Sequence, residues 1–244
     1  MSAMLYPERN LLLGGLSAAE QHRLYPCLEL VELIPGAVLY EPYEPMRYAY
    51  FPLTSILSVL CRLKNGDSLE FAVTGNDGFF DIALLLGGQS APRLAIVHSG
   101  GQACRLEAHV LKAEFARCGN MHDLFLRYVQ AVVTQASQTV VCNRHHVVQQ
   151  QLCRWLLTFL DRLGTNRVNM THQRIAGMLG VRRESVTLAA RNLQQLGVIC
   201  YHRGEISVLD RPRLESLSCE CYRVVTRERE RLLQHYRLPA TGTA

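Results

Sequence analysis

Two arginines and a glutamate stand side by side in residues 180–186, which read GVRRESV. Arginine and glutamate, the residues at positions 183 and 184, can both recognise the edges of DNA bases. An arginine donates two hydrogen bonds to guanine O6 and N7, and a glutamate accepts a hydrogen bond from cytosine N4. Two positive charges at the start of a helix also oppose the helix dipole, at a cost of about a few tenths of a kcal/mol each. A merely solvated helix end would leave that cost without compensation. The segment therefore indicates contact with a nucleic acid.

Charge is divided unevenly along the chain. Residues 1–162 carry 13 Lys and Arg against 14 Asp and Glu, whereas residues 163–244 carry 13 against 7, a net of +6. All 13 basic residues of this last third are arginine, whose planar guanidinium suits phosphate and guanine. The imbalance predicts that a polyanion contacts the C-terminal third.

The spacing around the arginines predicts two helices and a hairpin that would position them. Thr171 suits the N-cap of a short helix that ends at Gly180, and a second helix begins with the arginines. Residues 198–210 then alternate apolar and polar side chains around Arg203 and Gly204, as in a β-hairpin. Helix, turn, helix and hairpin in this order make a winged helix-turn-helix.

The two helices are expected to pack through apolar side chains, with Ala176 and Gly180 permitting a close approach and Val181 buried in the turn. The expected contacts join Ile175, Ala176 and Leu179 to Val186, Ala190 and Leu193. The remaining face would meet DNA, with the hydroxyls of Thr171 and Ser185 and the ring of His172 on phosphate oxygens. The whole expected DNA-binding set is Thr171, His172, Arg182, Arg183, Glu184, Ser185, Thr187, Leu188, Arg191 and Arg203.

Residues 27–106 have the pattern of short strands separated by turns. Asn65-Gly66-Asp67 lies between two apolar runs and predicts a tight hairpin turn, because these residues tolerate positive φ angles. Several closely spaced short strands indicate an antiparallel barrel or jelly roll. The expected strands fall in residues 37–42, 48–53, 55–63 and 69–73.

A proline-free stretch over residues 108–162 predicts two helices. In the first, a stripe recurs every three or four positions over some 20 residues, and it faces either the protein's own barrel or the same helix of a second chain. We expect the second arrangement, with dimerisation through residues 121–143. A second helix over residues 145–162 would end at Gly164 and would bury Leu152, Trp155, Leu156, Phe159 and Leu160. The expected dimer contacts are Leu124, Tyr128, Val132, Gln135 and Thr139.

Over residues 25–210 the chain resembles the Crp/Fnr superfamily of bacterial transcription regulators. The residues THQRIAGMLGVRRESV match the pattern T-x-x-x-I-A-x-x-L-G-x-x-R-E-S/T-V of that family. The resemblance places Arg183 and Glu184 on base-reading positions and Ser185 on a phosphate contact. Leu188 departs from the pattern, because the family commonly has a polar or arginine reader there, although a leucine suits contact with a thymine methyl group.

The resemblance implies an α+β fold with an N-terminal antiparallel β-roll (jelly roll), a long dimerisation helix and a C-terminal winged helix-turn-helix. The corresponding regions are residues 1–107, 108–163 and 164–244. The implied function is sequence-specific regulation of transcription by a homodimer on a two-fold DNA site. The implied partners are double-stranded DNA, a second copy of the chain and RNA polymerase.

The effector pocket is less similar to the family. Cyclic-nucleotide binders carry a phosphate cassette like F-G-E-L-x-L followed by an arginine, whereas this chain has Phe80, Asp81 and Ile82 in the cassette and Arg93 beyond it. Phe80 replaces the glycine whose bare backbone would approach the phosphate. We therefore expect an effector other than the usual cyclic AMP. The alternative is a cyclic-nucleotide response through a divergent pocket.

Other classes of site and location have little support. The nine cysteines show no C-x-x-C spacing, Cys219 and Cys221 being the closest pair, so no metal site, cofactor or disulfide framework is expected. His22, His145 and His146 are taken as ordinary surface or capping residues rather than haem ligands. No nucleophile–base or P-loop motif indicates an enzyme. No apolar run reaches the roughly 18 residues of a membrane span, and no signal peptide is recognised, so a cytoplasmic protein without a membrane partner is expected.

Overall fold

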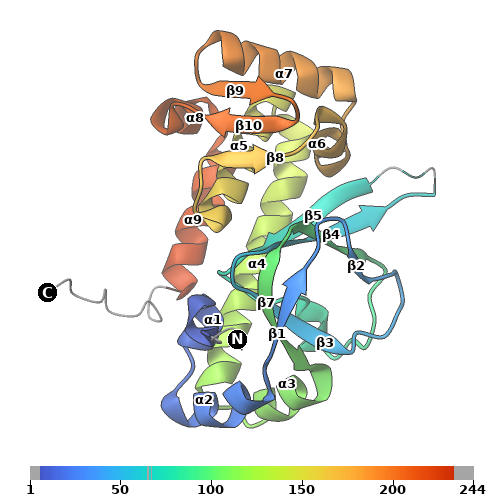
Figure 1. Cartoon of the computed structure of the whole chain (residues 1–244), viewed down its shortest axis with the longest axis vertical. Coiled ribbons are helices and arrows are strands. Elements are labelled where there is room, and N and C mark those ends of the chain that lie inside the picture. The colour runs from blue at the N-terminus through green and yellow to red at the C-terminus, as the bar shows by residue number, and fades with distance from the viewer. Residues whose placement is uncertain (1–5, 65, 67, 234–244) are drawn as a thin grey trace, which may run out of the picture. The chain divides into compact units, whose positions relative to one another are not determined.

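The computed structural model describes residues 6–64, 66 and 68–233, and Figure 1 shows the order of its helices and strands. Asn65 and Asp67 of the expected hairpin turn lie outside the described residues. So does the C-terminal segment 238–244, for which the composition predicts disorder. No helix within the described ranges is both long enough and apolar enough to cross a bilayer.

By compactness the chain forms two units. The first comprises Met1–Ser58, Thr74–Val132 and Arg229–Ala244, and the second comprises Val59–Val73 and Val133–Glu228. The expected regional boundaries after residues 107 and 163 rest on sequence pattern and remain a prediction.

The first unit holds most of two antiparallel sheets. One sheet has the order β1-β7-β3 and the other β2-β6-β4-β5. Strand β4 begins in the first unit and continues into the second, and β5 belongs to the second unit except for Thr74. This is the antiparallel β-roll that the short strands predict. The strands are β1 (Glu29–Leu33), β2 (Val38–Tyr40), β3 (Tyr48–Pro52), β4 (Ile56–Arg62), β5 (Ser68–Thr74), β6 (Leu94–Ser99) and β7 (Gly101–Glu107).

Short helices flank these strands. Ser17 begins α2 with a capping box, in which its hydroxyl accepts from the amide of Glu20 and the Glu20 carboxylate accepts from the amide of Ser17. The rings of Phe51, Phe79 and Phe125 lie 5.0–6.2 Å apart and form an aromatic core. The helical elements are η1 (Pro7–Arg9), α1 (Leu11–Gly14), α2 (Ala18–Leu24), η2 (Tyr25–Cys27), η3 (Ile82–Leu84) and α3 (Ala108–Phe115).

Helix α4 (Asn120–His145) is continuous, but the stripe expected to pair two chains faces the interior of its own chain. The Tyr128 hydroxyl donates to the carbonyl oxygen of Phe79 at 3.0 Å, and Gln135 Oε1 accepts from Arg162 Nη2 at 3.2 Å. Buried side chains have no surface left for a partner. The dimer contacts predicted at Leu124, Tyr128, Val132, Gln135 and Thr139 are therefore wrong, because the stripe belongs to the core.

A different face of α4 is both apolar and exposed. Leu126, Val133 and Val140 are 43%, 53% and 69% exposed and recur every seven residues. That is the spacing at which helices pair side by side. The helix thus carries two stripes, one buried and one open to solvent.

The second unit contains the expected winged helix-turn-helix. Figure 1 shows α7 beside the small sheet of order β8-β10-β9, which holds the wing. Arg203 (φ 47°) and Gly204 (φ 85°) form the tight turn between β9 and β10. The elements are α5 (Val148–Leu163), β8 (Arg167–Asn169), α6 (His172–Leu179), α7 (Arg183–Gln195), β9 (Ile199–His202), β10 (Glu205–Val208), α8 (Arg211–Leu217) and α9 (Glu220–Leu233).

The packing of α6 on α7 follows the sequence with two corrections. Gly180 is the left-handed C-cap of α6 (φ 66°), and a Cβ there would meet Leu69 Cδ1 at 2.9 Å, so the glycine does not serve to bring α6 and α7 together. Val181 is half-buried rather than buried. The expected contact residues of both helices are all buried, namely Ile175, Ala176, Leu179, Val186, Ala190 and Leu193.

Candidate nucleic-acid interface

The exposed face of α7 carries the charged residues that begin the helix. Arg182 is its N-cap without a side-chain cap bond, and Arg183 and Glu184 fill the first turn. One helical turn on, Leu188 is 60% exposed, although a leucine normally contributes to a core. Arg191 is exposed on the following turn. The face therefore presents donors, an acceptor and an apolar contact to an external partner.

The arginines of this face are not neutralised by the protein itself. Within the part of the chain that the structure describes, Arg182, Arg183, Arg191 and Arg203 make no ion pair, whereas Arg211 on α8 pairs with Asp161 at 2.5 Å. Unpaired positive charges on one face produce a field that attracts a polyanion. The arrangement therefore supports the binding of phosphate groups, which would neutralise these arginines.

His172 connects α6, α7 and the wing. Its Nδ1 lies 3.1 Å from Thr187 Oγ1, and its ring stacks on Tyr201 with the centroids 4.1 Å apart. Burial and the positive charge of Arg183 lower the pKa of His172 below its ordinary value of 6.5, so the ring is neutral at pH 7. Its Nδ1 contact and its stacked ring position His172 within the domain, and its predicted contact with phosphate remains a prediction.

Two hydroxyls of the expected DNA-binding set also have partners inside the protein. Thr171 Oγ1 accepts from the amide of Arg174 at 3.3 Å, which confirms its role as N-cap of α6. The Thr187 hydroxyl donates to the carbonyl oxygen of Arg183 at 3.0 Å. Ser185 is half-buried in the first turn of α7. These residues orient the two helices whether or not they also touch DNA.

An open groove of about 800 Å³ runs along this face and collects five of the ten predicted residues. The sequence prediction missed Gln194 and Gln195, although both lie one helical turn beyond Arg191. It also missed Tyr201, because the wing reaches the helix only through the tertiary fold. The groove is lined by Thr171, His172, Gln173, Arg183, Thr187, Ala190, Arg191, Gln194, Gln195 and Tyr201.

The predicted effector residues come together in the β-roll, where three of them are buried and Arg93 is half-buried. Phe80 is 1% exposed and its ring stacks on Tyr40, with the centroids 6.4 Å apart. Asp81 Oδ1 accepts from the amide of Ala83 at 3.0 Å, and its Oδ2 lies 3.5 Å from Arg93 Nη2. Ile82 is also buried. At the cassette the Phe80 ring therefore packs against Tyr40, and the Asp81 carboxylate pairs with Arg93.

The cysteine spacing predicts no metal site, yet the second unit gathers four metal-binding side chains. Cys142, His146, Cys219 and Cys221 place one donor atom each within 4.8 Å of all the others. The local signal is the pair Cys142 and His146, which stand four residues apart and hence one helical turn apart. The second pair lies more than 70 residues further along, so only the fold brings the pairs together.

Comparison with known proteins supports the helix-turn-helix assignment and the fold. Residues 150–217 match the Crp-like helix-turn-helix domain family. A global nitrogen regulator from Synechococcus elongatus is 19% identical over 192 residues, which are 75% of this chain and 86% of that protein.

Two of the similar solved structures match most of this chain. A Crp/Fnr-family putative transcriptional regulator from Eubacterium rectale superposes with a TM-score of 0.67 at 17% identity, covering 84% of this chain and 96% of that one. FixK2 from Bradyrhizobium japonicum gives a TM-score of 0.68 at 17% identity, covering 79% and 98%. At these identities the likeness establishes the fold, and it confirms the β-roll and winged-helix architecture.

Proposed function

We propose that this chain, which carries a Crp-like helix-turn-helix domain on the fold of the Crp/Fnr regulators, is a homodimeric regulator that binds duplex DNA sequence-specifically. The observation that carries the proposal is the exposed face of α7. Its arginines lack ion pairs inside the described chain, and its first turn offers a bidentate donor beside a carboxylate acceptor. Arg183 and Glu184 read bases, and Arg191 holds a phosphate.

The chain pairs with a second copy through the exposed stripe of α4. Leu126, Val133 and Val140 recur at heptad spacing, and pairing would remove three exposed apolar side chains from water. Two copies related by a two-fold axis present two α7 helices to half-sites about one turn of DNA, roughly 34 Å, apart. The bound dimer regulates transcription at a promoter, where RNA polymerase is its candidate partner.

The dimer interface is tested by introducing like charges into it. Val133→Glu combined with Val140→Glu should convert the dimer into monomers, because four carboxylates would meet across the two-fold axis. Sedimentation equilibrium gives the mass of the particle. Ile34→Glu is the matched control, since Ile34 is 71% exposed and lies outside α4, and it should leave the mass unchanged. Dimers that persist in the double variant would contradict this interface.

The β-roll responds to a ligand other than cyclic AMP, because Phe80 and the ion pair between Asp81 and Arg93 fill the cassette. One observation favours the alternative of a divergent cyclic-nucleotide pocket. Arg93 already lies against the cassette, where a phosphate-neutralising arginine is required. Calorimetric titration with cyclic AMP separates the two, since micromolar binding would establish the alternative.

Selection from random duplex DNA tests the proposed function. The protein should enrich a two-fold symmetric motif, and duplex competitor should displace it more effectively than RNA of the same length. The selection should give the same motif with and without cyclic AMP. Recovery of no motif, or preference for RNA, would overturn the proposal.

A further inference from the structure

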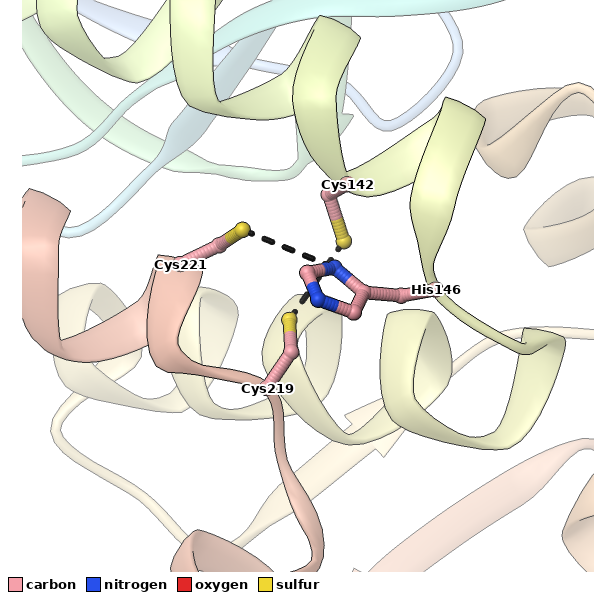
Figure 2. A group of neighbouring side chains, drawn as sticks. All are labelled: Cys142, His146, Cys219 and Cys221. Carbon is pink, nitrogen blue, oxygen red and sulfur yellow. Dashed lines mark hydrogen bonds between the residues drawn. The ribbon is translucent and has the colours of Figure 1, made fainter.

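Three cysteines and a histidine of the second unit surround one point, as Figure 2 shows. Cys142 and His146 come from the last turn of α4 and the residue that follows it, and Cys219 and Cys221 flank the start of α9. The three cysteines are buried and all are free thiols. We propose that these four side chains form a structural zinc site.

Two separations between donor atoms match those of ligands on a tetrahedral ion, and all four donor atoms lie within 4.8 Å of one another. Cys142 Sγ lies 3.5 Å from Cys219 Sγ, and Cys221 Sγ lies 3.6 Å from His146 Nδ1. Zinc bonds of about 2.3 Å to sulfur and about 2.0 Å to nitrogen give tetrahedron edges of roughly 3.5–3.8 Å. An iron–sulfur cluster interposes several irons and sulfides between its thiolates, so it requires wider spacing than these atoms have.

The histidine is oriented as zinc-binding histidines are. Its Nδ1 faces the cysteines, while its Nε2 lies 3.3 Å from a carboxylate oxygen of Glu220. A carboxylate on the far nitrogen fixes the tautomer and makes the ring a stronger ligand. Gln151 Nε2 also donates to the carbonyl oxygen of His146 at 2.8 Å, which holds the backbone after α4 in place.

The charge of the surroundings agrees with this geometry. Zinc binding releases the three thiol protons to solvent, so a site of three thiolates, one neutral imidazole and Zn²⁺ carries a net charge of −1. Arg154 on α5 is 7% exposed, and its positive charge acts on both Cys142 and Cys221. No carboxylate in the described ranges pairs with this arginine. A buried, uncompensated guanidinium is costly, and an anionic zinc site next to it removes that cost.

The position of the site indicates what the zinc does. The two pairs of ligands lie at residues 142–146 and 219–221, so the chain between them contains the whole Crp-like helix-turn-helix domain at residues 150–217. The ion therefore ties together the two ends of that domain and anchors the start of α9. Loss of the ion, or oxidation of its thiolates, would release both ends.

Metal analysis of the full-length protein tests the site. Purified under reducing conditions, the wild type should contain one zinc per chain by plasma mass spectrometry. Cys219→Ser and His146→Ala should each lose it. Cys200→Ser and His145→Ala are the matched controls, because Cys200 and His145 are exposed and outside the cluster, and both should retain one zinc. Equal zinc contents in all five proteins would overturn the proposal.

Titration of stripped wild-type protein avoids dependence on variants that fold poorly. Cobalt added to this protein should give the d–d bands of a tetrahedral ion together with a thiolate-to-cobalt charge-transfer band. Chelator competition should show that Glu220→Gln weakens zinc binding by roughly 10–100-fold. Octahedral cobalt spectra, or a Cys142–Cys219 disulfide detected by mass spectrometry in stripped protein that takes up no metal under reducing conditions, would overturn the assignment.

Discussion

The exposed face of α7 and the cassette of the β-roll both contain an arginine close to an acidic residue, but the two pairs differ in burial and in partners. In the cassette, Asp81 and Arg93 pair with each other beside the buried ring of Phe80. On α7, Arg183 and Glu184 are exposed and form no ion pair within the described chain. The difference shows that the nature of the residues does not by itself make a binding site. Groups that the protein leaves unsatisfied and accessible are the ones that an external partner can satisfy.

The largest expected effect concerns stability at the two regions. Phe80→Ala removes a fully buried ring and should lower the free energy of unfolding by about 3–5 kcal/mol. Leu188→Ala should change it by less than about 0.5 kcal/mol, because that side chain is exposed. Urea denaturation followed by circular dichroism measures both. Similar losses in the two variants would show that the contrast in burial is mistaken.

A smaller effect is expected from the phosphate contact. Arg191→Ala should weaken binding to all DNA sequences alike and should reduce the slope of log affinity against log salt by about 0.9, the value for one phosphate. Fluorescence anisotropy at four salt concentrations measures the slope. Arg223→Ala removes the same charge from an exposed position of α9 outside the groove, and it should leave the slope unchanged. If both variants lower the slope equally, the effect comes from net charge rather than from α7.

The smallest effect concerns the pH dependence of folding. The pKa of His172 is lowered by burial and by Arg183, so below pH 6.5 the unfolded chain binds a proton more readily than the folded one. The contribution of the neutral ring to stability is therefore present at pH 7.5 and is lost as the pH falls through 6.5 towards the lowered pKa. Urea denaturation of the wild type and of His172→Gln at pH 7.5 and 5.5 should show the difference shrinking at low pH. A difference that does not change with pH would contradict the lowered pKa.

The winged helix-turn-helix could be predicted from sequence because its determinants are local. Thr171 caps α6, Gly180 ends it, and Arg203 with Gly204 turns the wing, and each acts within a few residues of its own position. The strands and turns of the β-roll are recognisable for the same reason.

Two of the differences between expectation and structure concern long-range packing. Helix α4 has two stripes at helical spacing, and periodicity does not say which stripe the rest of the chain covers. Tyr128 is buried because its hydroxyl reaches Phe79, a contact across 49 positions. Likewise, Cys142 meets Cys219 only when the chain between them has folded, so a search for close cysteine pairs could not find the cluster.

The central claim is that α7 reads base pairs, and the measurement that tests it most directly is the base preference of Arg183→Ala. Anisotropy titrations should compare wild type and variant on the selected site and on every single-base substitution of one half-site. We expect the variant to lose about 1–3 kcal/mol of binding free energy on the selected site. It should no longer distinguish the guanine–cytosine pair from other base pairs at one position, while its preferences at the other positions persist. An equal loss on every sequence, with all preferences intact, would contradict it, because Arg183 would then contact only the phosphate backbone.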